Sequence, residues 1–440
     1  MSMTLAQTRY GILSGEALSE TSSVFRGIPY AAPPVGQLRW KRPQPPIPWK
    51  GIREAVSFSA ICPQHRMEPG SFYHTEFYAG KDQVMQSEDC LYLNIWTPAQ
   101  SPEERCPVLF WIHGGAFAHG SGSEIEFDGA NFNQLGVILV TINYRCNALG
   151  FLTHPWLDAE TEDGCSGNYG CYDQIAALDW VRENITAFGG DPDNITIFGQ
   201  SAGAMSVQTL ISSPLAQGKF SKVIMQSGGG FGGLSLGCTK EQGVALAQEI
   251  IDRLGVSSLE ELRQVDAWKL VELSDQLSGR LCPVVDGRLL PDSHEALARS
   301  GKVADVPYLL GSCQDEMGPE SARRFAAGNY KWCKNQYALH RRAPYLYWFN
   351  RQMPGDDDAG AFHSSELWYV FGTLDRCWRP MTEADYQLSR IISNYWANFA
   401  KTGNPNAEGL PEWSPCLAGT PTELTLGQRM LNHPVNLDQE

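Results

Sequence analysis

The segment at residues 194–204 constrains the fold more than any other part of the 440-residue chain. It begins with Ile-Thr-Ile-Phe, a run of β-branched and aromatic residues that is typical of a buried strand. The run leads into Gly-Gln-Ser-Ala-Gly at 199–203, and an apolar segment that can be helical follows. A strand, a Gly-x-Ser-x-Gly turn and a helix in this order are the context of a nucleophile elbow, where a strained turn exposes a serine hydroxyl. We therefore predict that Ser201 lies on a sharp turn between a central strand and a helix.

Other apolar segments indicate the rest of a central sheet. Residues 107–112 and 137–144 are nearly continuous apolar runs, which are typical of strands covered on both faces by helices. Residues 222–226 and 306–311 have the same character. Between these runs, residues 169–188 carry apolar side chains at the three- and four-residue steps of a helix. The alternation predicts a doubly wound α/β fold with a mostly parallel sheet flanked by helices.

The remaining segments are expected around this sheet. Residues 1–60 are predicted to form short strands and turns. Residues 61–86 contain several aromatic residues and are predicted to form a surface loop near the substrate pocket. Residues 240–275 and 320–350 are charged, helix-prone and weakly apolar, so we expect them to cap the sheet rather than belong to it. The second of these segments is predicted to be a reduced cap or regulatory segment. No repeat or linker divides the chain, so residues 1–440 are expected to form one domain.

Composition narrows the partners and the cellular location. A formal net charge of −15 argues against nucleic acid and anionic membrane surfaces as partners. The start of the chain lacks the pattern of a signal peptide, and no stretch approaches the roughly 18 apolar residues of a membrane span. Twelve cysteines occur without metal-ligand spacing, which favours reduced thiols in a cytoplasmic protein. We expect no cofactor, no metal, a small-molecule substrate and a monomer, although the sequence leaves the oligomeric state open.

A serine nucleophile also needs donors that stabilise a developing oxyanion. His-Gly-Gly-Ala at 113–116 follows a predicted central strand, and its small residues allow backbone N–H groups to turn inward. Gly114 and Gly115, together with the N–H of Ala202 after the serine, are the predicted oxyanion hole. The alternative is an ordinary glycine turn after a strand, and the presence of the nucleophile elbow argues against it.

The general base and the acid that orients it are expected after Ser201 in the chain. The histidines in that part are His294, His340, His363 and His433. His363 lies in a loop before an aromatic segment, and chain order favours it modestly over His294. Asp315 and Glu316 directly follow the apolar run at 306–311, and spacing alone does not choose between them.

Several long motifs are spread over nearly the whole chain. They are Ser-Glu-Asp-Cys-Leu-Tyr-Leu-Asn at 87–94, His-Gly-Gly-Ala-Phe at 113–117, Asn-Tyr-Arg at 143–145 with Leu-Gly-Phe-Leu at 149–152, Gly-Asn-Tyr-Gly-Cys-Tyr-Asp-Gln at 167–174, Phe-Gly-Gly-Asp-Pro through Ser-Ala-Gly at 188–203, and Pro-Val-Val-Asp-Gly at 283–287. In sequence and in order these motifs resemble type B carboxylesterases, the family of bacterial para-nitrobenzyl esterases, mammalian liver carboxylesterases and cholinesterases. The resemblance implies an α/β-hydrolase fold with helical cap segments and a serine carboxylic-ester hydrolase.

The resemblance assigns the catalytic residues one by one. Ser201 matches the nucleophile of the Gly-x-Ser-Ala-Gly motif, and Glu316 matches the acidic residue, which decides against Asp315. His363 matches the base, since Ser-Ser-Glu-Leu follows it as in the family's His-x-x-Glu-Leu segment. Arg145 with Asp173 resembles a buried structural ion pair of the family.

Residues beside these positions are candidates for an apolar acyl pocket. They are large apolar side chains close in sequence to the predicted site, and a role in the core is at least as well supported for each. The candidates are Phe117, Met205, Phe231 and Phe362.

The chain also departs from the family pattern. Gln200 replaces the glutamate that is common before the nucleophile, and Met317 replaces the usual glycine after the acid. Only 47 positions separate Glu316 from His363, fewer than the family's helical insertion needs, so we expect an open or reduced alcohol side of the pocket.

The cysteines give a further comparison with the family. Cys62 and Cys90 stand where many members carry a disulfide, and without a signal peptide a reduced pair is expected. The family's second disulfide is not expected, because only Cys238 lies in that region.

These observations predict a two-step acyl transfer on small to medium apolar esters. In this scheme His363 activates Ser201, Glu316 orients His363, and an acyl-enzyme is hydrolysed by water. One alternative is a catalytically silent binding module on the same fold. Another is a lipase, an amidase or a polyester hydrolase with the same catalytic residues.

Overall fold

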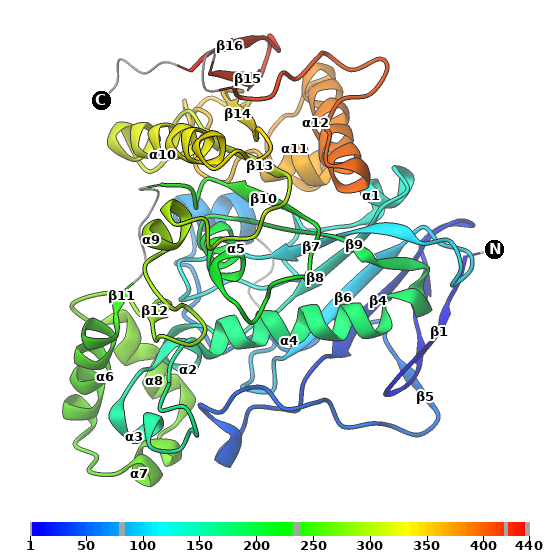
Figure 1. Cartoon of the computed structure of the whole chain (residues 1–440). Coiled ribbons are helices and arrows are strands. Elements are labelled where there is room, and N and C mark those ends of the chain that lie inside the picture. Colours follow the sequence, from blue (N-terminus) through cyan, green and yellow to red (C-terminus); the bar gives the residue numbers. More distant parts are fainter. Residues whose placement is uncertain (1, 79–83, 232–237, 418–420, 436–440) are drawn as a thin grey trace.

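A long mixed β-sheet forms the centre of the molecule in the computed structural model, which describes residues 2–78, 84–231, 238–417 and 421–435 (Figure 1). Among these residues the sheet has eleven strands, and the six neighbouring pairs from β15 to β8 are parallel. The antiparallel pairs lie toward its two ends. In spatial order the strands are β16 (Asn432–Pro434), β15 (Thr422–Leu426), β14 (Tyr345–Phe349), β13 (Tyr308–Cys313), β10 (Lys222–Gln226), β9 (Gly190–Gln200), β7 (Cys106–Ile112), β8 (Ile138–Ile142), β6 (Tyr92–Thr97), β4 (Ser23–Pro29) and β3 (Glu16–Ala17). The predicted mostly parallel α/β fold is confirmed.

The central strands separate two hydrophobic cores. In β7, Phe110 and Ile112 enter the core on one face, whereas Leu109 and Trp111 between them enter the core on the other face. All four side chains are fully buried. Because successive side chains of a strand point to opposite faces, a continuous apolar run is what two covered faces require.

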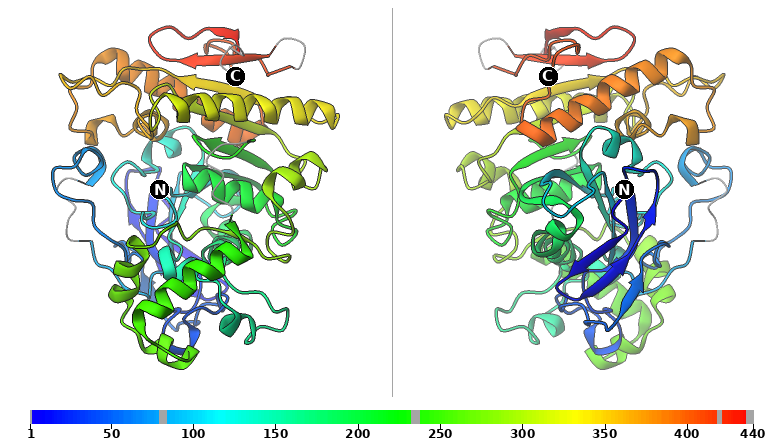
Figure 2. Two further views of the ribbon diagram at one scale, coloured as in Figure 1. Left: turned by 90° about the vertical axis from the view of Figure 1, so that its left-hand side faces the viewer. Right: turned by 90° about the vertical axis from the view of Figure 1, so that its right-hand side faces the viewer.

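Helices cover both faces of the sheet (Figures 1 and 2). Helices α4 (Tyr169–Asn184) and α5 (Ala202–Ser212) pack in the first core. Helices α1 (Ala130–Gln134), α11 (Leu367–Phe371) and α12 (Glu383–Thr402) pack in the second. The chain also contains α2 (Asn147–Phe151), α3 (Pro155–Asp158), α9 (His294–Arg299), the 3₁₀ segments Gly36–Leu38, Ile185–Phe188 and Leu374–Arg376, and a π-helical turn at His74–Tyr78. No helix within the described ranges combines the length and the apolar character that crossing a bilayer requires.

A separate helical excursion lies beside the sheet. Its helices are α6 (Lys240–Leu254), α7 (Leu259–Gln264) and α8 (Ala267–Asp275), which cluster together in Figure 1. The excursion begins and ends at a small parallel sheet of β11 (Cys238–Thr239) and β12 (Val284–Val285). The prediction that residues 240–275 are helical and lie outside the main sheet is confirmed.

The prediction for residues 320–350 is wrong in its last part. Helix α10 (Pro319–Ala338) lies outside the sheet, but β14 lies within it, between β13 and β15. The charged residues of this window all lie at 320–342, and one prediction for the whole window conceals Tyr-Leu-Tyr-Trp-Phe at 345–349. This aromatic run has strong strand propensity.

The first 60 residues form short strands and turns as predicted. Outside β3 and β4, they contain a three-stranded sheet of β1 (Leu5–Thr8), β2 (Gly11–Ser14) and β5 (Ile52–Glu54).

A buried ion pair fixes the loop after β8 to helix α4. The guanidinium of Arg145 donates to both carboxylate oxygens of Asp173, at 2.8 and 2.7 Å, and the Arg145 backbone N–H donates to the same carboxylate at 3.1 Å. Both side chains are almost completely buried. Removing one partner leaves an uncompensated charge in the interior.

We therefore expect Asp173→Ala to lower the free energy of unfolding by about 3–5 kcal/mol. The matched control is Glu183→Ala, which removes the exposed ion pair with Arg9 and should change stability by at most about 1 kcal/mol. Urea unfolding monitored by tryptophan fluorescence measures both values. Equal effects of the two substitutions would contradict the role assigned to the buried pair.

Candidate active site

Ser201 lies on the turn between β9 and α5, as the sequence predicts. Its backbone has φ 56° and ψ −125°, a conformation that non-glycine residues rarely adopt. Its N–H donates to the carbonyl of Gln226 on β10 at 2.9 Å, and its carbonyl accepts from the N–H of Met205 at 3.0 Å. The neighbouring strand and the helix together hold the strained turn.

The two glycines of the turn allow direct backbone packing. A Cβ atom on Gly203 would lie 2.1 Å from the carbonyl oxygen of Ile112, at the end of β7. A Cβ atom on Gly199 would lie 2.5 Å from the carbonyl carbon of Gly203. Side chains at these positions would push α5 away from the sheet.

Glu316 and His363 meet although they come from distant loops. Glu316 follows β13, and His363 precedes α11. The Nδ1 atom of His363 forms a short hydrogen bond with a Glu316 carboxylate oxygen, and the other oxygen accepts from the N–H of Cys313 at 2.8 Å. Burial opposes the charged form of His363, but the carboxylate of Glu316 outweighs it and raises the pKa of the imidazole.

The neighbouring carboxylate, Asp315, has a different contact. Its Oδ2 atom accepts from the backbone N–H of Ala361 at 2.8 Å and so ties together the two loops that carry Glu316 and His363. The structure therefore pairs Glu316, and not Asp315, with the imidazole.

The other candidate histidines lie elsewhere. His294 contacts the hydroxyl of Thr209 at 3.0 Å, and burial lowers its pKa to about 4. His433 lies 3.8 Å from Glu423, and His340 is exposed. None of them lines the cavity beside Ser201.

Ser201 and His363 line one cavity of about 270 Å³. Gln200 also lines it, and its side-chain nitrogen lies 3.3 Å from Nε2 of His363. Nε2 is the ring nitrogen that Glu316 does not contact. The cavity is therefore bordered by a hydroxyl, an imidazole oriented by a carboxylate, and a neutral amide.

Gly114 and Gly115 border the same cavity. A Cβ atom on Gly114 would lie 3.3 Å from Cβ of Ser201. The backbone has positive φ angles at Gly115, Ala116 and Phe117, of 93°, 56° and 61°. Within the described ranges, the N–H groups of Gly114 and Gly115 donate no hydrogen bond. Two unused donors thus lie beside the serine.

The four predicted acyl-pocket residues do not line this cavity. Phe117 packs edge-on against Phe151, with ring centroids 5.1 Å apart, and Met205 is buried on α5. Phe231 packs against Trp332, and Phe362 against aromatic residues of the surface loop. Proximity in sequence misled the prediction, because side chains next to a strained turn or an inward loop point into the core behind it.

Residues from segments remote in sequence line the cavity instead. Many are aromatic or ionisable side chains, and the aromatic richness of residues 61–86 was the one sequence signal for some of them. They include Met67, Tyr73, Phe77, Tyr78, Trp111, His119, Glu124, Glu126, Arg280, Met317 and Leu367.

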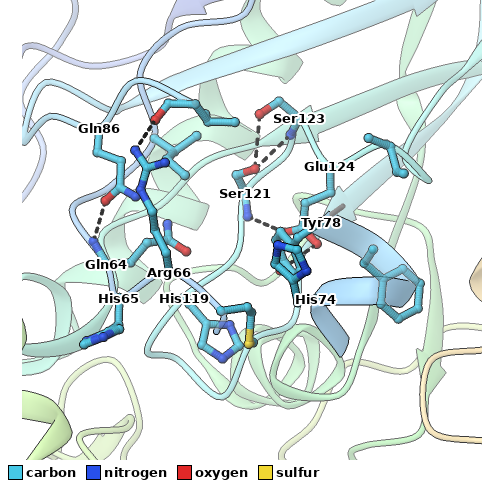
Figure 3. A pocket seen from close by; sticks show the side chains of 15 residues that line it. Gln64, His65, Arg66, His74, Tyr78, Gln86, His119, Ser121, Ser123 and Glu124 are labelled. Atoms are coloured by element: carbon cyan, nitrogen blue, oxygen red, sulfur yellow. Dashed lines mark hydrogen bonds between the residues drawn. The ribbon is translucent and has the colours of Figure 1, made fainter. Parts of the chain in front are cut away.

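A smaller cavity of about 80 Å³ adjoins the first and shares His119, Tyr78 and Glu124 with it (Figure 3). The Glu124 carboxylate accepts from the N–H of Ser121 at 2.6 Å and from the hydroxyl of Tyr78 at 3.1 Å. Burial raises the pKa of Glu124 to about 7. Burial, and then the charge of Glu124, raise the pKa of Glu126 well above its ordinary value. Glu124 lines both cavities and Glu126 lines the larger one, and the two carboxyl groups together keep at least one proton at neutral pH.

A comparison with models of protein families identifies the family of this chain. The model of the carboxylesterase family matches residues 2–327 and 321–438. The chain belongs to the carboxylesterase family. The para-nitrobenzyl esterase of Bacillus subtilis (strain 168) is 35% identical over 472 aligned positions, which cover 93% of this carboxylesterase and 92% of the relative. This carboxylesterase is accordingly a serine carboxylic-ester hydrolase that acts on small-molecule esters.

Solved structures give the same family for this carboxylesterase. A para-nitrobenzyl esterase structure superimposes with a TM-score of 0.86 and 32% identity, covering 99% of this chain and 98% of the other. The carboxylesterase of Geobacillus stearothermophilus superimposes with a TM-score of 0.85 and 34% identity, covering 99% of both chains. The predicted α/β-hydrolase fold is confirmed.

The two segments matched by the family model meet at residues 321–327, within α10. This position lies between Glu316 and His363, which are 47 positions apart.

The raised pKa values of the carboxyl pair predict a pH-dependent stability. Above the ordinary glutamate pKa the folded state holds more protons than the unfolded state, so a rising pH destabilises the folded state. The stabilisation from the protonated carboxyl pair is therefore complete below about pH 4.5 and is lost as the pH rises through about 7. Glu126→Gln is neutral at every pH. We expect it to increase the free energy of unfolding at pH 8.5 by about 1–3 kcal/mol relative to the wild type, and much less at pH 5.

Denaturant unfolding at the two pH values measures this difference. Glu103→Gln removes an exposed carboxylate and serves as the control, with no such dependence. A Glu126→Gln variant whose stability differs from that of the wild type by the same amount at both pH values would contradict the raised pKa of Glu126.

Proposed function

We propose that this carboxylesterase hydrolyses small to medium apolar esters through an acyl-enzyme on Ser201, with His363 as general base and Glu316 as the acid that orients it. The observation that carries the proposal is the hydrogen bond between Glu316 and His363 at a cavity that Ser201 also lines. A hydroxyl, an imidazole and a buried carboxylate from three separate segments are the set that this chemistry requires.

In the proposed acylation step, Nε2 of His363 takes the hydroxyl proton of Ser201 as the oxygen attacks the ester carbonyl. Glu316 accepts from Nδ1–H, which leaves the Nε2 lone pair directed toward the cavity and stabilises the imidazolium that forms. The imidazolium then gives its proton to the leaving alcohol. Water repeats the sequence in deacylation and restores the free serine.

We further propose that the N–H groups of Gly114, Gly115 and Ala202 form the oxyanion hole. The first two have no other acceptor among the described residues, and Ala202 begins α5, where helix N–H groups are unpaired. Each such donor is worth on the order of 10²–10³ in kcat. Burial lowers the pKa of the adjacent His113 to about 3, so this residue adds no positive charge there.

The preference for apolar esters of limited size rests on the cavity itself. Its volume of about 270 Å³ is at the small end of ligand pockets, and Tyr73, Phe77, Trp111 and Leu367 line it. Polar side chains line it as well, among them Glu124, Glu126 and Arg280, so only part of the wall is apolar. A bulky polyester would have to bind mostly outside this cavity.

The test of the nucleophile is Ser201→Ala. We expect loss of hydrolysis of a short-chain para-nitrophenyl ester by at least about 10⁴-fold, with no labelling by a fluorophosphonate probe. Ser206→Ala, on the same helix, serves as the control and should retain both. Turnover retained by Ser201→Ala would overturn the assignment, and a wild type that the probe does not label would favour the silent binding module.

Glu316→Gln tests the orienting acid. Neutral glutamine no longer stabilises the imidazolium, so we expect kcat to fall by roughly 10²–10⁴-fold. The raised pKa of His363 places the acid limb of kcat/KM above about pH 6.5, since activity requires the neutral imidazole. In the variant this limb should move to lower pH. Asp315→Asn is the matched control and should keep both kcat and the acid limb near those of the wild type.

A further inference from the structure

Two cysteines lie side by side where the helical excursion begins and ends. Cys238 begins β11, and Cys282 lies two positions before β12. Their Sγ atoms are 2.9 Å apart, although both are free thiols in this structure. The parallel pairing of Cys238 with Val284, and a hydrogen bond from the Cys238 N–H to the carbonyl of Pro283 at 3.1 Å, fix the two backbones beside each other. A disulfide can form only where the backbone already brings the side chains together, and this requirement is met here.

We propose that Cys238 and Cys282 form a reversible disulfide in the folded enzyme and close the helical excursion into a covalent ring. This inference concerns a modification site and does not depend on the proposed catalytic roles. Cys282 lies 44 positions after Cys238 in sequence, and only the fold brings the two thiols together.

The pair has an accessible and a protected member. Cys238 is partly exposed, whereas Cys282 is 2% exposed. A hydrogen bond from the Cys282 thiol lowers the pKa of Cys238 to about 7, which favours its thiolate at neutral pH. Cys238 is therefore the thiol that a soluble oxidant meets first, and Cys282 is placed to resolve the product.

Glutathione disulfide is the oxidant of the proposed reaction. The Cys238 thiolate attacks one sulfur of glutathione disulfide, forms a mixed disulfide and releases one glutathione thiolate, which takes a proton. The Cys282 thiolate, after losing its proton, attacks the Sγ atom of Cys238 and releases the second glutathione. Two protein thiols are thus oxidised to one disulfide, and one glutathione disulfide is reduced to two glutathione molecules.

The ring would enclose α6, α7 and α8. Closing a long loop stabilises the folded state mainly by restricting the unfolded chain. Arg280, which lines the catalytic cavity, lies two positions before Cys282. The disulfide would therefore anchor both the base of the excursion and the segment that brings Arg280 to the cavity.

Another close pair in the same chain offers an internal comparison. The Sγ atoms of Cys333 on α10 and Cys416 lie 2.8 Å apart, but both residues are only 1% exposed. The same oxidant reaches them only when the structure opens. In the native enzyme we expect the Cys238–Cys282 linkage to form first.

The first experiment incubates the native full-length enzyme with glutathione disulfide, alkylates the remaining thiols and maps peptides without reduction. We expect a peptide that links Cys238 to Cys282 in the wild type, appearing at least tenfold faster than one that links Cys333 to Cys416. In Cys282→Ser, glutathione should remain attached to Cys238. A wild type that keeps glutathione on Cys238, joins Cys238 to another cysteine or keeps both thiols free would overturn the proposal.

The second experiment uses limited trypsin digestion, since Arg253, Lys269 and Arg280 are exposed inside the proposed ring. Fragments cut at these sites should stay joined on a non-reducing gel and separate after addition of dithiothreitol. The oxidised enzyme should also unfold at a Tm about 4 °C higher than the reduced enzyme. Fragments that separate without reductant, with an unchanged Tm, would contradict the ring.

Discussion

The contact between the backbone of Gly203 and the carbonyl of Ile112 is the constraint on which the site depends. It brings the N-terminus of α5 against the end of β7, so the turn at Ser201 has no room to relax. Gly114 and Gly115 follow β7 after His113, and they consequently lie beside the serine. One close approach of helix and strand therefore determines both the strained turn and the position of the donors beside it.

The position of His363 depends on a different set of contacts. Phe362, directly before it, packs against Phe72 and Phe77 of the surface loop, with ring centroids 4.9 and 6.3 Å apart. The π-helical turn in that loop is held by a buried ion pair, in which Arg379 donates to Glu76 at 2.5–3.1 Å. The surface loop is therefore part of the support for the imidazole and also lines the cavity.

Local patterns in the sequence predicted the fold well, because an apolar run or a Gly-x-Ser-x-Gly turn acts on neighbouring residues. The predictions for the turn at Ser201, for β7 and for the helical excursion rest on such local patterns. The choice of Glu316 over Asp315 needed the family resemblance, since two adjacent carboxylates have the same spacing from the strand. Cavity-lining residues such as Arg280, and the approach of Cys282 to Cys238, depend on contacts between distant segments. Such contacts cannot be predicted from a local pattern. The strand β14 was missed for a different reason, because residues 320–350 were treated as one segment.

The two ends of the main sheet are short. In the described part of the chain, β3 at one end has two residues and β16 at the other has three. Glu16 on β3 is exposed and pairs with Arg26 at 2.6 Å, which places charge along that border. A strand at the edge of a sheet has unpaired backbone N–H and C=O groups that can pair with another chain. A short, charged edge strand pairs in this way less readily. The short strands and the charge at these borders therefore disfavour the addition of a strand from another copy of the chain.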